Sequence, residues 1–410
     1  MARIGNLFIA GAEDLGGIYK CGVSYALSKK PPSSFLYTTR QGDWQVEFTT
    51  ESTDVVARSA NEISYNAVQS RGFSAIQEAL DVLSVKGILS ASLADPARSS
   101  ICVYRRSGKT VLAVYSLFDF PMGVNVEVTQ IDASGNEVKP PPPQEPMWNE
   151  SFRYYRLSQC SSDLFDAYRN LFLAFEALLN SICQKKRSEG ESAWLRRALS
   201  VVAAKTSLAQ STPTGNEDPV SYIINSQYKN VRCKLQHAKF PNAQLPHDQA
   251  TPQEVKQAYS ELVRIWRQIA GEYFGVPTGG GVITYIGFSK MMEGAFQSGV
   301  SIHYTPDMSP PARNDTKVSP KGLPSHEFSL SEYVGQAKPG VVRILGKENV
   351  LNGSERHKSP VHRICTATSS TLFGVAFIES GLTVVGVDEW EYIHDLRLIN
   401  SSQPRVEFKT

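Results

Sequence analysis

The first third of the chain follows the two-residue alternation of β-strands. Apolar and polar side chains alternate through 124–128, which indicates a strand with one buried face. Two apolar runs, 101–104 and 111–115, flank Ser107-Gly108, a pair that favours a hairpin turn. The alternation predicts a β-rich region.

One helix interrupts these strands. Apolar residues recur at helical spacing from Tyr65 to Leu83, and Gly87 is typical of a residue just beyond a helix. The proline-rich segment 139–146 is incompatible with a helix or a central strand. It therefore marks a boundary after a β-rich N-terminal domain of residues 1–138.

Four stretches with helical spacing follow, and short connections between amphipathic helices predict a bundle. We expect this helical domain to cover 151–275. The apolar residues that define the stretches begin at Leu164, Trp194, Val220 and Val255 and end at Ile182, Val202, Leu235 and Ile269.

Two of these helices carry strong start signals. Asp218-Pro219 combines an acidic N-cap with proline at the first helical position. The segment 251–254 is a Thr-Pro-Gln-Glu capping box. The start of the third and fourth helices is thus placed to within a residue.

Strand-like patterns return beyond the three glycines at 279–281. Apolar runs predict strands at Val282–Phe288 and Val300–Tyr304, and a hairpin of Leu372–Ile378 and Leu382–Val387 around Glu379-Ser-Gly381. The polar, proline-rich segment 305–325 predicts a long mobile loop. We therefore expect a multidomain α+β protein with a central bundle of four to five helices. Whether the β-rich ends, 1–138 and 279–410, form separate domains or one composite sandwich stays open.

Composition narrows the class of protein. With 41% hydrophobic and 20% charged residues the chain is an ordinary globular protein, and no apolar stretch reaches the length of a membrane span. Glu13 and Asp14 interrupt the apolar start, which is unlike a signal peptide. The six cysteines are scattered, as expected of free thiols in a reducing cytosol. We therefore expect a cytoplasmic protein with no membrane association, no metal and no other cofactor.

The helical region is the basic part of the chain. Residues 151–275 contain 16 Lys and Arg against 11 Asp and Glu, a net charge of +5. This balance permits a polyanionic partner without requiring one, because nucleic-acid footprints are usually denser.

The end of the third helix brings together groups that suit acid–base chemistry on a phosphodiester. His237 is of a type that transfers protons near neutral pH, and the guanidinium of Arg232 is of a type that holds a phosphate. Such groups suit RNA cleavage, in which the 2′-hydroxyl is the nucleophile. The surrounding candidates for binding the substrate are Lys229, Asn230, Lys234 and Lys239.

The same residues have plainer interpretations. On a straight helix Arg232 and His237 point about 140° apart, so either the helix is distorted or the site is shared across an interface. His237 also suits a helix C-terminus, where a cation stabilises the macrodipole. Arg232 is equally suited to an ion pair with Glu176 on the first helix. Arg356 and His362 have a similar spacing, but they lie in a segment without helical pattern.

This region resembles the HEPN superfamily, the higher-eukaryote-and-prokaryote nucleotide-binding domains. The aromatic-rich segment 168–179 resembles that family's first helix, and Tyr228-Lys-Asn-Val-Arg232 followed by His237 resembles its catalytic Arg-x4-6-His helix. The arrangement is similar to the Apea-like branch and, more loosely, to the methylamine-utilisation J proteins. The resemblance covers the central third of the chain.

The resemblance implies a metal-independent endoribonuclease whose active site forms between two copies of the chain. It implies an RNA substrate, a homodimer and a role as a toxin or an antiviral defence effector. Many active members carry Asn, Asp or His directly after the arginine, where this chain has Cys233. The alternative is a catalytically silent dimerisation scaffold whose β-rich regions bind a protein or a ligand.

Overall fold

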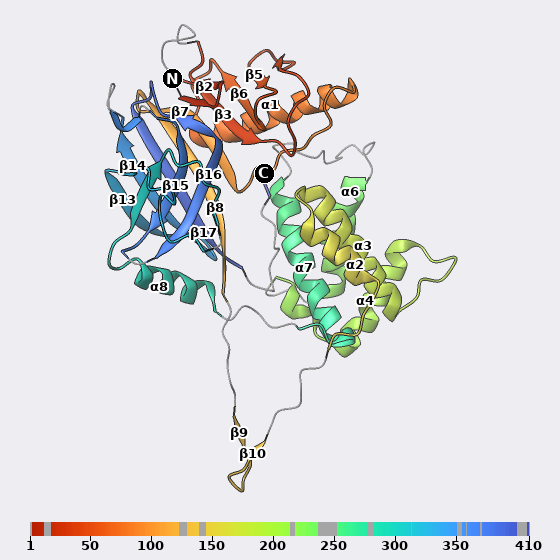
Figure 1. Cartoon of the computed structure of the whole chain (residues 1–410). Coiled ribbons are helices and arrows are strands. Elements are labelled where there is room, and N and C mark those ends of the chain that lie inside the picture. Colours follow the sequence, from red (N-terminus) through yellow and green to blue (C-terminus); the bar gives the residue numbers. More distant parts are fainter. Residues whose placement is uncertain are drawn as a thin grey trace. The chain divides into compact units, whose positions relative to one another are not determined.

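The computed structural model shows a multidomain α+β protein (Figure 1). It describes residues 2–409 except 12–17, 123–128, 139–144, 214–217, 237–251, 278–282, 313, 351–354, 358, 370 and 400–407. The chain divides into two compact units. The sheet unit comprises 1–120, 283–398 and 409–410, and the helical unit comprises 121–282 and 399–408.

Two sheets form the sheet unit. The larger has the strand order β13 (Leu330–Lys338), β14 (Val341–Asn349), β17 (Glu389–Ile399), β8 (Lys109–Pro121), β7 (Ser99–Arg106), β3 (Cys21–Ala26), β6 (Asp54–Ser59), β5 (Gln45–Phe48) and β4 (Phe35–Thr38). The smaller has the order β12 (His326–Glu327), β11 (Ser301–Thr305), β15 (Val361–Ala367), β16 (Leu372–Thr383), β1 (Ala2–Ile4) and β2 (Leu7–Ala10).

Strands from the two ends of the sequence are neighbours in both sheets. In the larger sheet β17 lies beside β8, and in the smaller sheet Arg3 of β1 is paired with Thr383 of β16. The β-rich ends therefore form one composite unit, which answers the question that the sequence pattern left open.

The local elements expected near the N-terminus are present. The predicted helix is α1 (Tyr65–Val85), which buries its apolar stripe against the larger sheet. The predicted hairpin is β7–β8, and its turn residues Ser107 and Gly108 have φ angles of 52° and 80°. Positive φ angles at both central residues are typical of a tight hairpin turn. Glycine is favoured at such positions.

Two of the predicted C-terminal elements are wrong. The segment predicted as strand Val282–Phe288 instead begins the helix α8 (Tyr285–Ala295), whose N-cap Thr284 accepts a hydrogen bond from the backbone N–H of Gly287. The residues predicted as a turn, 379–381, lie inside the single strand β16. There Val361 and Arg363 of β15 are paired with Leu382 and Phe377, so the extra residues form a bulge.

The loop that follows β11 is tied to the smaller sheet. Its described residues between 306 and 325 form no helix or strand. The guanidinium of Arg363, a fully buried residue of β15, donates to the carbonyls of Ser309 and Val318 and to the carboxylate of Asp315. The buried carboxylate of Asp307 accepts from the hydroxyl of Ser319.

The helical unit contains the predicted helices and one that the sequence did not indicate. Its helices are α2 (Ser151–Cys160), α3 (Leu164–Ile182), α4 (Glu191–Lys205), the short helix η1 (Leu208–Ser211), α5 (Pro219–Ile223), η2 (Ile224–Arg232), α6 (Cys233–Gln236) and α7 (Pro252–Phe274), and it also holds the strand pair β9 (Gln130–Ile131) and β10 (Glu137–Val138). The unexpected helix is α2, whose Tyr155 stacks on Trp266 at a centroid distance of 4.1 Å. The buried residues of α2 are Ser151 and Ser158, and Phe152 and Tyr155 are partly buried, so its apolar pattern is weak.

The core of this unit follows the predicted stripes. Tyr168, Phe172 and Phe175 of α3 are buried, as expected of core residues. Asp218 caps α5 by accepting from the N–H of Ser221, which confirms that start signal. Thr251, 124–128 and the glycines 279–281 lie outside the described residues.

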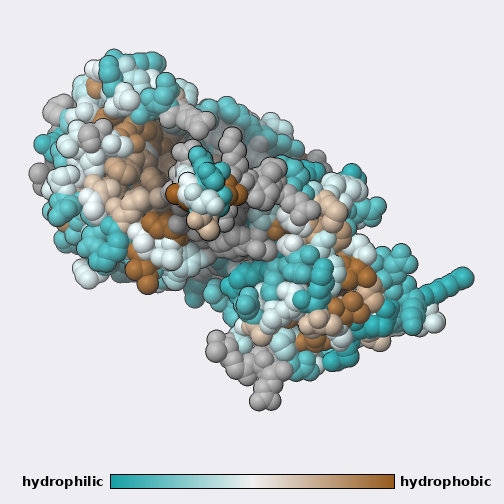
Figure 2. Space-filling model, turned by 90° about the horizontal axis from the view of Figure 1, so that it is seen from below, coloured by the Kyte–Doolittle hydropathy of each residue, from teal (hydrophilic) through white to brown (hydrophobic). Residues whose placement is uncertain are grey.

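Charged residues occupy the connection between α3 and α4. The segment 184–190 extends from the bundle in Figure 1, and Lys185, Lys186 and Arg187 in it are exposed. Its surface is hydrophilic in Figure 2. The basic run 185–187 is therefore part of a solvated loop.

Candidate functional site

The helix that carries the candidate residues changes its winding before Arg232. It starts as α5, continues through the π-helical η2 and ends as α6. The N–H of Cys233 bonds to the carbonyl of Tyr228, five residues earlier, as in a π-helix. Inside this segment the hydroxyl of Tyr168 donates to the backbone carbonyl of Gln227 at 2.7 Å. Departures of this kind recur at functional sites.

Arg232 lies between two carboxylates from different helices. Its side chain is 17% exposed, and its Nη2 lies 3.6 Å from Oε1 of Glu176 on α3 and 3.5 Å from Oε1 of Glu191 on α4. The ion pair with Glu176 that the sequence suggested is therefore present, and Glu191 is a second partner that it did not indicate. Removing Arg232 would leave this half-buried pair without a cation.

Aromatic rings flank the same guanidinium. Its Cζ lies 5.4 Å from the ring centroid of Tyr228 and 5.8 Å from that of Phe172. A guanidinium at these distances is attracted to the ring faces, and partial burial strengthens the attraction. The rings and the carboxylates together hold Arg232 in a defined position.

Arg232 nevertheless makes no hydrogen bond within the part of the chain that the structure describes, and its Nε is buried without a partner. Arg197 provides the contrast, because its Nε, Nη1 and Nη2 donate to Glu189, Cys183 and Gln184. Distances of 3.5–3.6 Å to the two glutamates are those of ion pairs without hydrogen-bond geometry. Within the described residues, the planar donors of Arg232 therefore meet no acceptor.

The two glutamates beside Arg232 share a proton. Burial, together with the hydrogen bond to Glu191 and the charge of that neighbour, raises the pKa of Glu176 to about 8. The same hydrogen bond lowers the pKa of Glu191. At neutral pH the pair therefore carries close to one negative charge, which a single guanidinium balances.

The other candidate residues are spread over the surface of this helix. Lys229 and Asn230 are exposed, and Lys234 and Cys233 are half-buried. His237 and Lys239 lie outside the described residues.

A buried polar network joins this helix to α7. The sequence pattern did not predict it. The carboxylate of Glu261 on α7 is 5% exposed and accepts from the hydroxyl of Tyr222 and the amides of Gln227 and Gln257. Gln227 is fully buried. The available signal was a glutamine and a glutamate at positions where an apolar stripe continues on both sides, since buried polar groups need partners.

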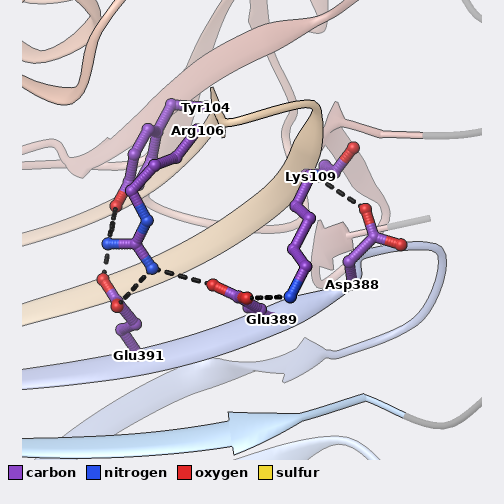
Figure 3. A network of polar contacts seen from close by, with 7 residues as sticks. Tyr104, Arg106, Lys109, Asp388, Glu389 and Glu391 are labelled. Carbon is purple, nitrogen blue, oxygen red and sulfur yellow. Dashed lines mark hydrogen bonds and ion pairs between the residues drawn. The ribbon is translucent and has the colours of Figure 1, made fainter.

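A second charged cluster lies in the sheet unit and closes on itself (Figure 3). Arg106 donates to Glu389 at 2.8 Å and to Glu391 at 2.7 Å, and Lys109 donates to Glu389 at 2.6 Å. Two cations and two carboxylates neutralise one another. This cluster joins the β7–β8 turn to the start of β17, so its role is structural.

The other Arg–His spacing of the sequence also lies in the sheet unit. Nδ1 of His362 is 3.0 Å from the backbone carbonyl of Ile378, and Arg356 lies 3.8 Å from the buried carboxylate of Glu348. Each side chain thus has its own separate partner. The geometry does not join them into a site.

Comparisons with models of protein families, with curated proteins and with solved structures gave no match for this chain. Across the described residues, no group of three or more His, Cys, Asp and Glu is placed to hold a metal ion. No helix found there has the length and apolar character to cross a membrane. All six cysteines are free.

Proposed function

We propose that the helical unit is a metal-independent endoribonuclease in which Arg232 holds the scissile phosphate and His237 transfers the proton. In this reaction the 2′-oxygen of the ribose attacks phosphorus and the bond to the 5′-oxygen breaks. The proton of the 2′-hydroxyl passes to a base, and the leaving oxygen takes one up. The products are a 2′,3′-cyclic phosphate and a 5′-hydroxyl.

The observation that carries this proposal is that Arg232 makes no hydrogen bond with any described residue. An arginine that serves only to join two helices normally places its N–H groups on acceptors, as Arg197 does. Arg232 is held in place by charge and by two rings, while its donors meet no acceptor within the described part of the chain. A phosphate matches the planar donor pattern of a guanidinium.

The glutamate pair is compatible with that role. Two ionised carboxylates would over-neutralise Arg232 and repel a phosphate. Because Glu176 keeps its proton at neutral pH, only about one negative charge opposes the guanidinium. The substrate's phosphate would therefore compete with a single carboxylate, that of Glu191, at a distance of 3.5 Å.

The proposal includes a second copy of the chain. The HEPN resemblance implies that two Arg/His pairs meet at a dimer interface, and a role in defence or as a toxin would follow from RNA cleavage. The exposed Lys229 and Asn230 would then contact the RNA backbone beside the scissile phosphate.

A catalytically silent scaffold is the second candidate. The observation that favours it is the burial of Arg232, since a side chain 17% exposed with two glutamates and two rings around it also suits a purely structural joint. In this case the bundle serves dimerisation, and the sheet unit binds a protein or a ligand.

Purified protein incubated with mixed RNA in EDTA tests the proposal. The wild type should produce 2′,3′-cyclic phosphate ends and leave DNA intact, whereas Arg232→Lys and His237→Ala should be inactive. Arg232→Lys keeps the charge for Glu191 and loses the planar fork. Arg187→Lys, in the exposed loop, is the matched control and should retain activity.

Melting temperatures must accompany these assays because Arg232 is paired. Lost cleavage with an unchanged melting temperature supports phosphate binding by Arg232. Full activity in both the Arg232 and His237 variants, or cleavage that EDTA abolishes, would refute the ribonuclease mechanism and leave the scaffold.

A further inference from the structure

A polar cavity lies in the helical unit between the C-terminal half of α7 and η1. Its volume is about 600 Å³, within the range of small-molecule sites. On α7 it is lined by residues that recur every three or four positions and thus share one face of the helix. These residues are Arg264, Arg267, Gln268, Gly271 and Glu272, and Gly275 follows directly after the helix.

The opposite wall of the cavity is fixed to α7 by hydrogen bonds. The side chain of Gln268 accepts from the hydroxyl of Ser211 and donates to the backbone carbonyl of Ser207. Ser211 belongs to η1, and Ser207 directly precedes it. The cavity is therefore bounded by elements that are bonded to each other.

Two arginines give this cavity a positive charge that no ion pair among the described residues cancels. Arg264 is exposed and makes no hydrogen bond or ion pair with any described residue. Arg267 donates from Nη2 to the carbonyl of Pro277 and from Nη1 to the hydroxyl of Tyr155, and its Nε is buried without a partner. Neutral acceptors hold Arg267, so its charge is not cancelled.

Glu272 is the one carboxylate among the described lining residues, and it already forms an ion pair. Oε1 of Glu272 lies 3.5 Å from Nζ of Lys205. Lys205 is further held over the ring of Tyr273, at 4.3 Å from its centroid. Glu272 and Lys205 neutralise each other, which leaves the charges of Arg264 and Arg267 facing the cavity.

We propose that this cavity is a binding site for the phosphate groups of a small polyphosphorylated ligand, held by Arg264 and Arg267. Two guanidiniums one helical turn apart suit the oxygens of adjacent phosphates. The exposed amide of Gln210, also in the lining, is a further donor. This site is separate from Arg232 and does not depend on the proposed cleavage of RNA.

The lining also limits which part of a nucleotide the cavity can recognise. No aromatic side chain is among the described residues around the cavity. A base would find no ring on which to stack, and stacking is the usual means by which proteins hold bases without hydrogen-bond readout. Recognition therefore follows the number of phosphates and is indifferent to the base.

Calorimetric titration of the full-length protein tests the site with inorganic pyrophosphate, ATP and GTP. All three should bind, and ATP and GTP, which carry the same number of phosphates, should have affinities within a few-fold of each other. Arg264→Ala should weaken each by about tenfold or more, because it removes a charged hydrogen bond. Among the described residues Arg264 has no hydrogen bond or ion pair to lose, and Arg267→Lys provides a second variant. Arg187→Ala has the same change of charge outside the cavity and should bind as the wild type does.

A second set of binding measurements, with RNA, shows whether the bound phosphate belongs to an RNA backbone or to a free ligand. A fluorescent oligoribonucleotide whose binding depends on Arg264, with no binding of pyrophosphate, would assign the site to the RNA backbone. Pyrophosphate binding that RNA does not displace would assign it to a free ligand. If the affinity of none of the probes depends on Arg264, the cavity is not a phosphate site. The same holds if Arg187→Ala loses as much affinity as Arg264→Ala. These assays measure binding and not cleavage. A negative result would therefore refute the phosphate site and leave the ribonuclease proposal unaffected.

Discussion

Replacing Glu176 with glutamine should change how stability depends on pH. The folded protein raises the pKa of Glu176 to about 8, while an unfolded glutamate titrates at its ordinary value near 4.5. Between these values the folded state holds a proton that the unfolded state has lost. Glu176 therefore contributes stability that is full below pH 4.5 and is lost as the pH rises through about 8.

The size of the effect follows from the one proton involved. A difference of one bound proton changes the free energy of unfolding by about 1.4 kcal/mol per pH unit. From pH 5.5 to 7.5 the wild type should thus lose at most about 2.7 kcal/mol relative to Glu176→Gln, or roughly 5–10 °C in melting temperature. The lowered pKa of Glu191 acts below pH 4.5, outside this window.

Thermal melts in matched buffers from pH 5 to 8.5 provide the measurement, with the fluorescence of Trp194 and Trp266 reporting on the helical unit. Glutamine keeps an N–H donor for Glu191 and cannot ionise. Glu150→Gln is the control, because Glu150 is exposed and makes no side-chain capping bond. Parallel pH profiles for wild type and Glu176→Gln would show that Glu176 is ionised in the folded protein, and the proton-sharing argument would be refuted.

Three further substitutions probe packing, capping and the tied loop. Phe172→Ala should lower the stability of the helical unit by about 3–5 kcal/mol, since this side chain is buried and its removal leaves a cavity; denaturant melts would show this. Thr284→Ala should cost about 1 kcal/mol through loss of the cap on Gly287, and an unchanged melt of the sheet unit would contradict the role of the cap. Arg363→Ala should leave Asp315 unpaired and make the 306–325 loop sensitive to protease, while wild type resists; equal cleavage rates would show that Arg363 does not hold the loop.

Local patterns predicted the local structure well. The helix from Tyr65, the Ser107-Gly108 turn and the Asp218 cap each depend on residues close together in sequence, and all three are present. The run 282–288 was misjudged because seven residues are too few to distinguish the helical from the strand period. Its cap, Thr284, is the better signal.

Contacts between residues far apart in the sequence could not be predicted from the local hydrophobic pattern. The π-helical segment depends on Tyr168 and Gln227, which come from different helices, and nothing near Gln227 in sequence announces that contact. Glu191 is an ion-pair partner of Arg232 although it lies 41 residues earlier in the sequence, on a different helix. The pairing of β17 with β8 joins residues from opposite ends of the chain, and short-range periodicity holds no information about such a contact.

The strand order of the larger sheet has a consequence for biosynthesis. The strand β17 lies between β8 and β14, so on the ribosome the sheet stays open until residues 389–399 have been made. Residues 121–282 emerge earlier and contain nearly all of the helical unit. Since domains generally fold as units during synthesis, the helices should assemble while β7 and β8 still lack their C-terminal neighbours. A chain released prematurely after residue 282 would present an unpaired β8 edge, and such edges invite aggregation.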